Sequence, residues 1–89
     1  MIQSVSINMA KAYALFSDDA TTWASAKEVA TRTGILPRTS RSVCELLREH
    51  GVLESVHAHP GWRYRLSASM PPDFALRARL DKAREVFGV

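Results

Sequence analysis

Residues 25–51 read SAKEVATRTGILPRTSRSVCELLREHG, and this stretch decides the expected fold of the 89-residue chain. Ser25 is followed three residues later by Glu28, the spacing of a capping box, in which a hydroxyl and a carboxylate each bond a free amide at the start of a helix. Gly34 accepts the positive φ at which a helix ends. Pro37 suits the first position of a new helix, because its missing N–H is no loss there. The stretch therefore predicts two short helices joined by a tight turn.

The second of these helices, expected from Pro37 to His50-Gly51, has one apolar and one polar face. Its apolar side chains are Val43, Cys44 and Leu47. The polar face carries Arg38, Arg41, Ser42, Glu45, Arg48 and Glu49. A short helix, a turn containing glycine and a second helix with outward arginines form the helix-turn-helix pattern, whose second helix lies in a DNA major groove.

The residues that follow predict a β-hairpin. Residues 52–56 are β-prone, residues 57–61 contain the turn signal Pro60-Gly61, and residues 62–66 alternate strictly. On the second arm one face carries Trp62, Tyr64 and Leu66, and the other carries Arg63 and Arg65. We expect the aromatic face to cover the helices and the arginine face to meet phosphate.

From about residue 22 to residue 67 the chain reads TWASAKEVATRTGILPRTSRSVCELLREHGVLESVHAHPGWRYRLS, which resembles a winged helix-turn-helix. Its order of elements is similar to the amino-terminal DNA-binding domains of IclR-type and MarR-type bacterial regulators. The resemblance implies a mainly α fold with a small β-hairpin wing (α+β) that binds double-stranded DNA. One departure is a turn about a residue longer than the common pattern, so that Ser40 falls where an apolar residue is usual. The choice between Arg38 and Thr39 as the base-facing residue stays open.

Before this region, residues 5–16 predict a helix that can bury Ile7, Ala10, Ala14 and Leu15 or Phe16. Its apolar side is wider than one contact needs, which fits either a second packing partner such as another subunit or a core helix with an untidy surface. The run Thr21-Thr22-Trp23 is β-prone and suits a single edge strand.

After the hairpin we expect a linker at residues 68–72 and a last helix at 73–89, capped by Asp73, so that residues 1–67 form the main domain. The last helix carries an apolar stripe of Leu76, Leu80, Ala83 and Phe87. A narrow stripe on a charged helix is the geometry of a two-helix seam, so we expect it to hold a homodimer. Packing on its own domain is the alternative.

Composition and charge agree with this organisation. Apolar residues make up 46% of the chain, enough for one compact domain. The formal charge is +3, and seven basic and four acidic side chains lie between Lys27 and Arg65. A polyanion partner fits this balance, although such a surplus is also ordinary for a soluble protein. The single cysteine, Cys44, cannot form an internal disulfide, and with no leader and no apolar run of about 18 residues we expect a cytoplasmic protein without a membrane contact.

We expect the DNA contacts to come from both helices and from the hairpin. The expected residues are Lys27, Arg32, Arg38, Thr39, Arg41, Ser42, Arg48, Arg63 and Arg65. Side chains in the first turns of the second helix reach base edges, where arginine can bond guanine in pairs. Lys27, Arg32 and the hairpin arginines suit the phosphate backbone or a minor groove. Solvated surface charge is the alternative for each of them.

Other functions find less support in the sequence. His57 and His59, with His50 and Cys44 elsewhere, lack a clear metal-site spacing, so neither a metal nor a cofactor is expected. No phosphate loop, acid pair or activated nucleophile indicates an enzyme. We expect a small dimeric transcriptional regulator, a repressor or an accessory factor. The alternatives are a winged-helix module that binds a protein, and a reader of RNA or single strands, which needs exposed aromatic side chains. Trp62 and Tyr64 are expected to cover the core instead.

Overall fold

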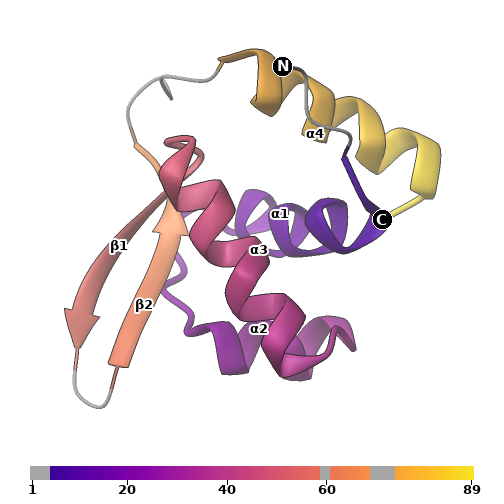
Figure 1. Ribbon diagram of the computed structural model, residues 1–89. Helices are drawn as coiled ribbons and strands as arrows, with labels where there is room; N and C mark the ends of the chain where they lie inside the picture. Colours follow the sequence, from indigo (N-terminus) through magenta and orange to yellow (C-terminus); the bar gives the residue numbers. More distant parts are fainter. Residues whose placement is uncertain (1–4, 59–60, 69–73) are drawn as a thin grey trace.

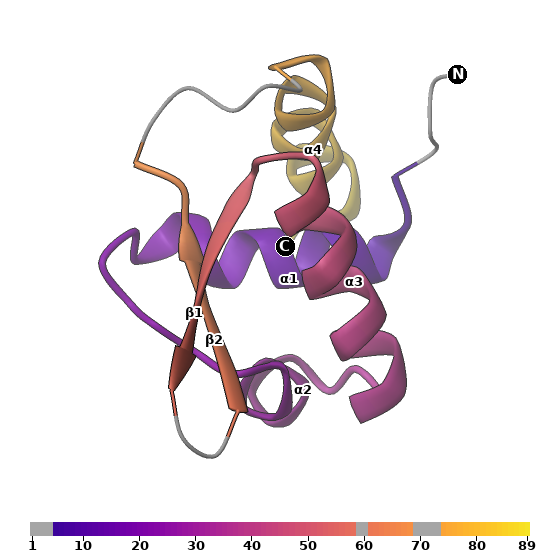
Figure 2. The same ribbon diagram turned by 60° about the vertical axis from the view of Figure 1, so that its left-hand side comes forward.

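A computed structural model describes residues 5–58, 61–68 and 74–89. Within them the elements follow in the order α1 (Ile7–Asp18), α2 (Ala26–Thr33), α3 (Pro37–Glu49), β1 (Leu53–Ala58), β2 (Gly61–Leu66) and α4 (Phe74–Phe87) (Figure 1). The expected class, mainly α with a small β-hairpin, is confirmed. Figure 2 shows α4 and α2 at opposite ends of the molecule, with α1 between them. The hairpin lies on one side of α1, and α3 lies on the other.

The local signals around α2 and α3 are confirmed. The Ser25 hydroxyl accepts a hydrogen bond from the Glu28 amide at 3.1 Å, and the Ser25 amide donates to the Glu28 carboxylate at 3.4 Å, which closes the capping box. Gly34 ends α2 with a φ of 78°, and Pro37 opens α3. These signals act within a few residues of themselves, which is why the sequence alone reveals them.

The structure explains why the polar Ser40 occupies a position where an apolar residue is usual. Its side chain is fully buried, and its hydroxyl donates a hydrogen bond of 2.7 Å to the carbonyl of Ala26 at the start of α2. A buried hydroxyl is tolerated when it is bonded in this way. The bond also fixes the register of α3, which leaves Arg38 exposed and Thr39 half-buried.

The hairpin strands pair antiparallel, with Leu53 opposite Leu66 and His57 opposite Trp62. Leu53, Tyr64 and Leu66 are buried against the helices, as expected. The expectation for Trp62 is wrong, because 53% of this residue is exposed. An exposed aromatic side chain is what a reader of RNA or single strands needs, so Trp62 no longer counts against that alternative. Trp62 lies close to the turn of the hairpin, past the point at which Tyr64 contacts the rest of the chain, and so it extends beyond the core.

The segment from Thr21 to Trp23 does not form the expected edge strand. The Asp19 carboxylate accepts hydrogen bonds from the hydroxyls of Thr22 and Thr21, at 2.5 and 2.8 Å, and these bonds keep the backbone in a turn. The same hydroxyls, Thr22 first, hold the pKa of Asp19 below its ordinary value. Sheet pairing is limited to the next residue, Ala24, which forms a one-residue antiparallel bridge to β2.

Tyr64 connects this bridge to the rest of the fold. Ala24 and Tyr64 exchange two backbone hydrogen bonds, of 2.9 and 2.8 Å. Tyr64 is buried, and its hydroxyl donates a hydrogen bond of 2.5 Å to the Glu45 carboxylate on α3. Arg48 donates to the same carboxylate. Burial, and then the bond to Glu45, raises the pKa of Tyr64. The Tyr64 hydroxyl, and then Arg48, lowers the pKa of Glu45.

The first helix begins two residues later than expected. The Ser6 hydroxyl caps α1 by accepting a hydrogen bond from the Met9 amide at 3.2 Å. Ala10, Ala14 and Phe16 are buried as expected, but Ile7 is exposed. The wide apolar side of α1 is covered by the other helices of its own chain, because α1 contacts α2, α3 and α4.

The last helix packs on α1, which corrects the expected dimer contact. Leu76, Leu80 and Ala83 are only 4%, 0% and 8% exposed, and Leu76 and Leu80 belong to the same core as Phe16 of α1. These three side chains are therefore not available to a second copy. The alternative, packing on the own domain, holds for them, while Phe87 is 41% exposed. The expected cap Asp73 and residues 69–72 of the expected linker lie outside the described residues.

Polar contacts reinforce this packing. The Tyr13 hydroxyl donates to the Asp81 carboxylate at 2.6 Å, and Arg84 donates to Asp18 at 2.8 Å. Burial, and then the bond to Asp81, raises the pKa of Tyr13. In the described part of the chain, no helix has the length and apolar character needed to cross a membrane.

Shortening the buried Leu80 tests whether α4 is part of the core. Leu80→Ala should cost about 2–5 kcal/mol of unfolding free energy, because it leaves a cavity in a packed interior. Val86→Ala is the matched control on the same helix, since Val86 is 71% exposed, and it should change stability by less than about 0.5 kcal/mol. Urea unfolding measures both. Equal midpoints for the two variants would mean that α4 is not packed as described. For the same reason, Leu80→Asp should unfold the protein instead of giving a folded monomer.

Removing the Tyr64 hydroxyl tests its bond to α3. Tyr64→Phe should cost about 1 kcal/mol at neutral pH, less than the roughly 1.5–3 kcal/mol of a hydrogen bond to a charged group, because the Glu45 side chain is 41% exposed. The pKa of Glu45 is held below its ordinary 4.5, so this contribution is present above pH 4.5 and is lost as the pH falls through the folded-state pKa. Urea unfolding of both proteins at falling pH should show the difference between them shrinking. A difference that stays constant in acid would contradict the bond.

Candidate nucleic-acid interface

Four of the nine predicted contact residues are exposed cations on α2 and α3 that have no carboxylate partner. They are Lys27, Arg32, Arg38 and Arg41. Among the residues that the structure describes, none of these four takes part in a salt bridge, and we call them the free cations. An exposed cation without an intramolecular partner keeps its full charge for an external anion.

The free cations are not all in one place. Lys27 lies in the first turn of α2, and Arg38 and Arg41 lie in the first two turns of α3. Arg32 lies in the last turn of α2, where its charge helps to lower the pKa of Asp19. The structure therefore brings Lys27 and Arg41 to the hairpin, as the hollows described below show, and leaves Arg32 at the other end of α2.

The polar residues of α3 next to these arginines differ in their exposure. Ser42 is exposed, and its hydroxyl donates to the Arg38 carbonyl one turn earlier, at 3.2 Å. Thr39 is half-buried. Arg38 is thus the more exposed member of the pair Arg38 and Thr39.

The three other predicted cations, Arg48, Arg63 and Arg65, are paired with carboxylates. Arg63 donates to Glu28 at 3.0 Å, and Arg48 donates to Glu45 at 3.2 Å. Arg65 donates to Glu54, which is its partner across the hairpin, and its guanidinium lies over the ring of Trp23, 4.5 Å from the centroid. These pairs are partly exposed, so each contributes little to stability. The pairs of Arg63 and Arg65 offset much of the positive charge expected on the hairpin, and the pair of Arg48 does the same on α3.

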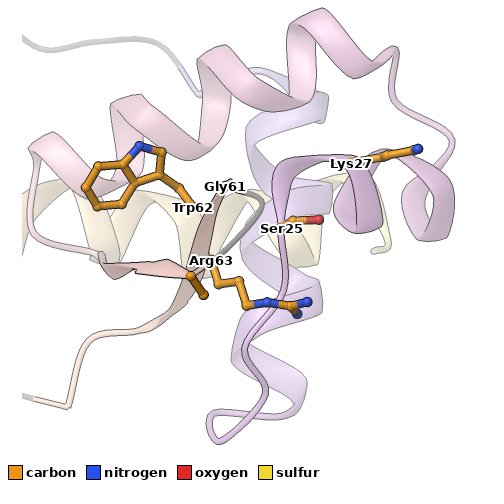
Figure 3. Close-up of a pocket in the computed structure, with 6 residues that line it drawn as sticks. Ser25, Lys27, Gly61, Trp62 and Arg63 are labelled. Carbon is orange, nitrogen blue, oxygen red and sulfur yellow. The ribbon is translucent and has the colours of Figure 1, made fainter.

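Trp62 lines two hollows. The first, of about 280 Å³, is lined by Ser25, Lys27, Ala58, Gly61, Trp62 and Arg63. Figure 3 shows Trp62 and Arg63 leaving β2 in different directions, with Arg63 turned toward the start of α2. The second hollow, of about 370 Å³, is lined by Ala26, Arg41, His57, Gly61, Trp62 and Tyr64. Trp62 therefore lines both hollows, one together with Lys27 and Arg63 and the other together with Arg41.

Two exposed apolar residues of this region were not predicted as site residues. Leu36 is 73% exposed at the N-cap of α3, directly before Pro37, and Trp62 is exposed at the end of the hairpin. The edge-to-face contact between His57 and Trp62, with ring centroids 5.0 Å apart, follows from their cross-strand pairing. For Leu36 no sequence signal of its exposure exists, because helical spacing aligns it with Val43 and Leu47; it is exposed because it is the N-cap residue, before α3 begins. The alternation of apolar and polar residues in β2 predicts the face of the strand on which Trp62 lies, but it does not predict where the core ends.

The described residues that were considered for a metal are His50, His57 and Cys44. Cys44 is buried, and burial raises the pKa of its thiol to about 12, so the thiol stays protonated. In residues 5–58, 61–68 and 74–89, no three His, Cys, Asp or Glu side chains gather where they could hold a metal ion. His59 lies outside these ranges.

A scan against protein-family models finds no match, and a search of curated proteins finds no similar sequence. The arrangement of α1, α2 and α3 followed by an antiparallel hairpin is compatible with a winged-helix layout.

Proposed function

We propose that the chain binds double-stranded DNA, with α3 in the major groove and the hairpin beside it. The observation that carries the proposal is the set of free cations at the starts of α2 and α3, above all Arg38 and Arg41 on the exposed side of α3. The first turns of the second helix are where helix-turn-helix proteins place the side chains that contact base edges. A major groove about 12 Å wide admits a helix with its side chains.

The residues divide into two roles. Arg38, Arg41 and Ser42 are placed for base edges, because they lie in the first half of α3 and are exposed. Lys27 is placed for a phosphate beside them, and Arg63 joins it when a phosphate takes the place of Glu28. The hairpin contribution to charge neutralisation is therefore smaller than a count of its arginines indicates.

The proposal extends to a transcriptional regulator, a repressor or an accessory factor, that acts as a homodimer in the cytoplasm. One short domain makes few base contacts, and two copies on two half-sites double them. With Leu76, Leu80 and Ala83 buried, the large apolar side chains that stay exposed on α4 are Phe74, Val86 and Phe87.

A module that binds another protein is the second candidate, and the exposed Leu36 beside Arg38 favours it, because an apolar side chain among charges suits a protein surface. The salt dependence of duplex binding separates the two. Affinity for a duplex should fall steeply between about 50 and 200 mM salt, because each neutralised phosphate contributes about −0.9 to the slope of log K against log salt. An absence of duplex binding at about 50 mM salt would refute the DNA proposal. Selection of duplexes from a random pool should then recover an inverted repeat.

Replacing Arg41 tests base reading. Arg41→Ala should weaken binding to the selected duplex by about 1–3 kcal/mol and relax the preference at one base position, because an arginine on a base edge carries sequence information. Lys82→Ala is the control, since it removes a similarly exposed charge from α4. Fluorescence anisotropy on the selected and on random duplexes measures both. Equal losses on the two duplexes would make Arg41 a phosphate contact.

Releasing Arg63 from Glu28 tests whether the ion pair masks a phosphate contact. Glu28→Gln removes the negative charge but keeps a side chain that can close the capping box. Binding to any duplex should become tighter. The slope of log K against log salt should steepen by about 0.9, the value for one phosphate contact. Glu85→Gln makes the same change of charge on α4 and serves as the control. If the two variants bind DNA alike, Arg63 makes no contact with phosphate.

A further inference from the structure

Trp62 is a large aromatic side chain that the core does not use. More than half of it is exposed, whereas Tyr64 and Leu66, which follow it on the same face of β2, are buried. Its ring contacts the exposed His57 edge to face, and both rings of this cross-strand pair lie near the surface. Tryptophan is enriched at contact surfaces, because its ring is apolar and its N–H can bond a partner.

The surroundings of Trp62 indicate what that contact is. Each hollow beside the indole contains basic side chains, Lys27 and Arg63 in one and Arg41 in the other. An aromatic platform flanked by cations is the combination with which proteins hold nucleotides, since the ring stacks on a base and the cations hold the phosphates. A protein surface would be expected to bring carboxylates to these cations without needing the flat ring between them.

We propose that Trp62 stacks on a base of the DNA duplex, inserting at an opened base step next to the groove that α3 occupies. The inference rests on the proposed DNA binding and adds an uncharged contact at the end of the hairpin. In an intact duplex the base faces are covered, so a stacking side chain needs a step that opens at low cost. Pyrimidine–purine steps such as TA and CA/TG are the most easily unstacked. Trp62 therefore selects sites that have such a step at a fixed distance from the bases that α3 contacts.

The two tryptophans of the chain make the test direct. In Trp23→Phe, Trp62 is the remaining fluorophore, and its emission should be quenched on titration with the selected duplex, because stacking on a base quenches indole fluorescence. In Trp62→Phe, the remaining Trp23 lies under the Arg65 guanidinium, and its emission should stay unchanged. Binding followed by anisotropy with an unchanged Trp62 emission would overturn the inference and leave the proposed function standing.

Affinity supplies an independent readout. Trp62→Ala should weaken duplex binding about 5- to 100-fold, as expected for the loss of one stacked base, and should leave the salt slope unchanged, because no charge is removed. It should also abolish any preference for TA or CA/TG at the selected step. Lys27→Ala serves as the comparison. Its slope of log K against log salt should be shallower by about 0.9, the value for one phosphate contact, and its preference for the base step should be unchanged. Unchanged affinity and step preference in Trp62→Ala would overturn the inference. An absence of salt-dependent binding by every variant, including the unmodified chain, would instead refute the proposed function.

Discussion

The position of the hairpin depends on Tyr64. Its backbone exchanges two hydrogen bonds with Ala24, and its buried hydroxyl bonds the Glu45 carboxylate of α3. The segment before α2, the hairpin and α3 come from separate stretches of the chain, and this residue joins all three. It lies two residues from Trp62, so the same contacts set the distance between the end of the hairpin and the exposed side of α3. Both parts of the proposed interface depend on that distance.

The charges near the interface are arranged unevenly. Within the part of the chain that the structure describes, the cations at the starts of α2 and α3 form no salt bridge, whereas Arg63 and Arg65 of the hairpin are held by Glu28 and Glu54. An arginine that already has a carboxylate gains less from a phosphate, because the new contact replaces an existing one. In the proposed complex, α3 would therefore be the main source of electrostatic attraction for DNA phosphate. It leaves the hairpin with a different contribution, the exposed indole of Trp62.

What the sequence could predict was decided by the range of the interactions. The capping box of Ser25, the end of α2 at Gly34 and the hairpin all follow from neighbours a few residues apart, and these predictions hold. The partner of Arg63 could not be predicted, because Glu28 lies 35 residues away in the chain. The stripe around Leu80 looks the same whether it packs on α1 or on a second copy, so its spacing could not settle the choice. Strand alternation assigned Trp62 to the core face, but only the assembled fold shows that the core ends before it.

We propose that one surface for duplex DNA is formed by the starts of α2 and α3 and the end of the hairpin. The most direct test is a titration of the isotopically labelled protein with a duplex, followed by amide and indole chemical shifts. The account predicts that the largest shifts occur near Lys27, Arg38 and Arg41 and at the indole of Trp62, while the exposed α4 residues Lys82 and Glu85 keep theirs. Shifts confined to α4, or shifts at α3 without any at Trp62, would contradict a single surface.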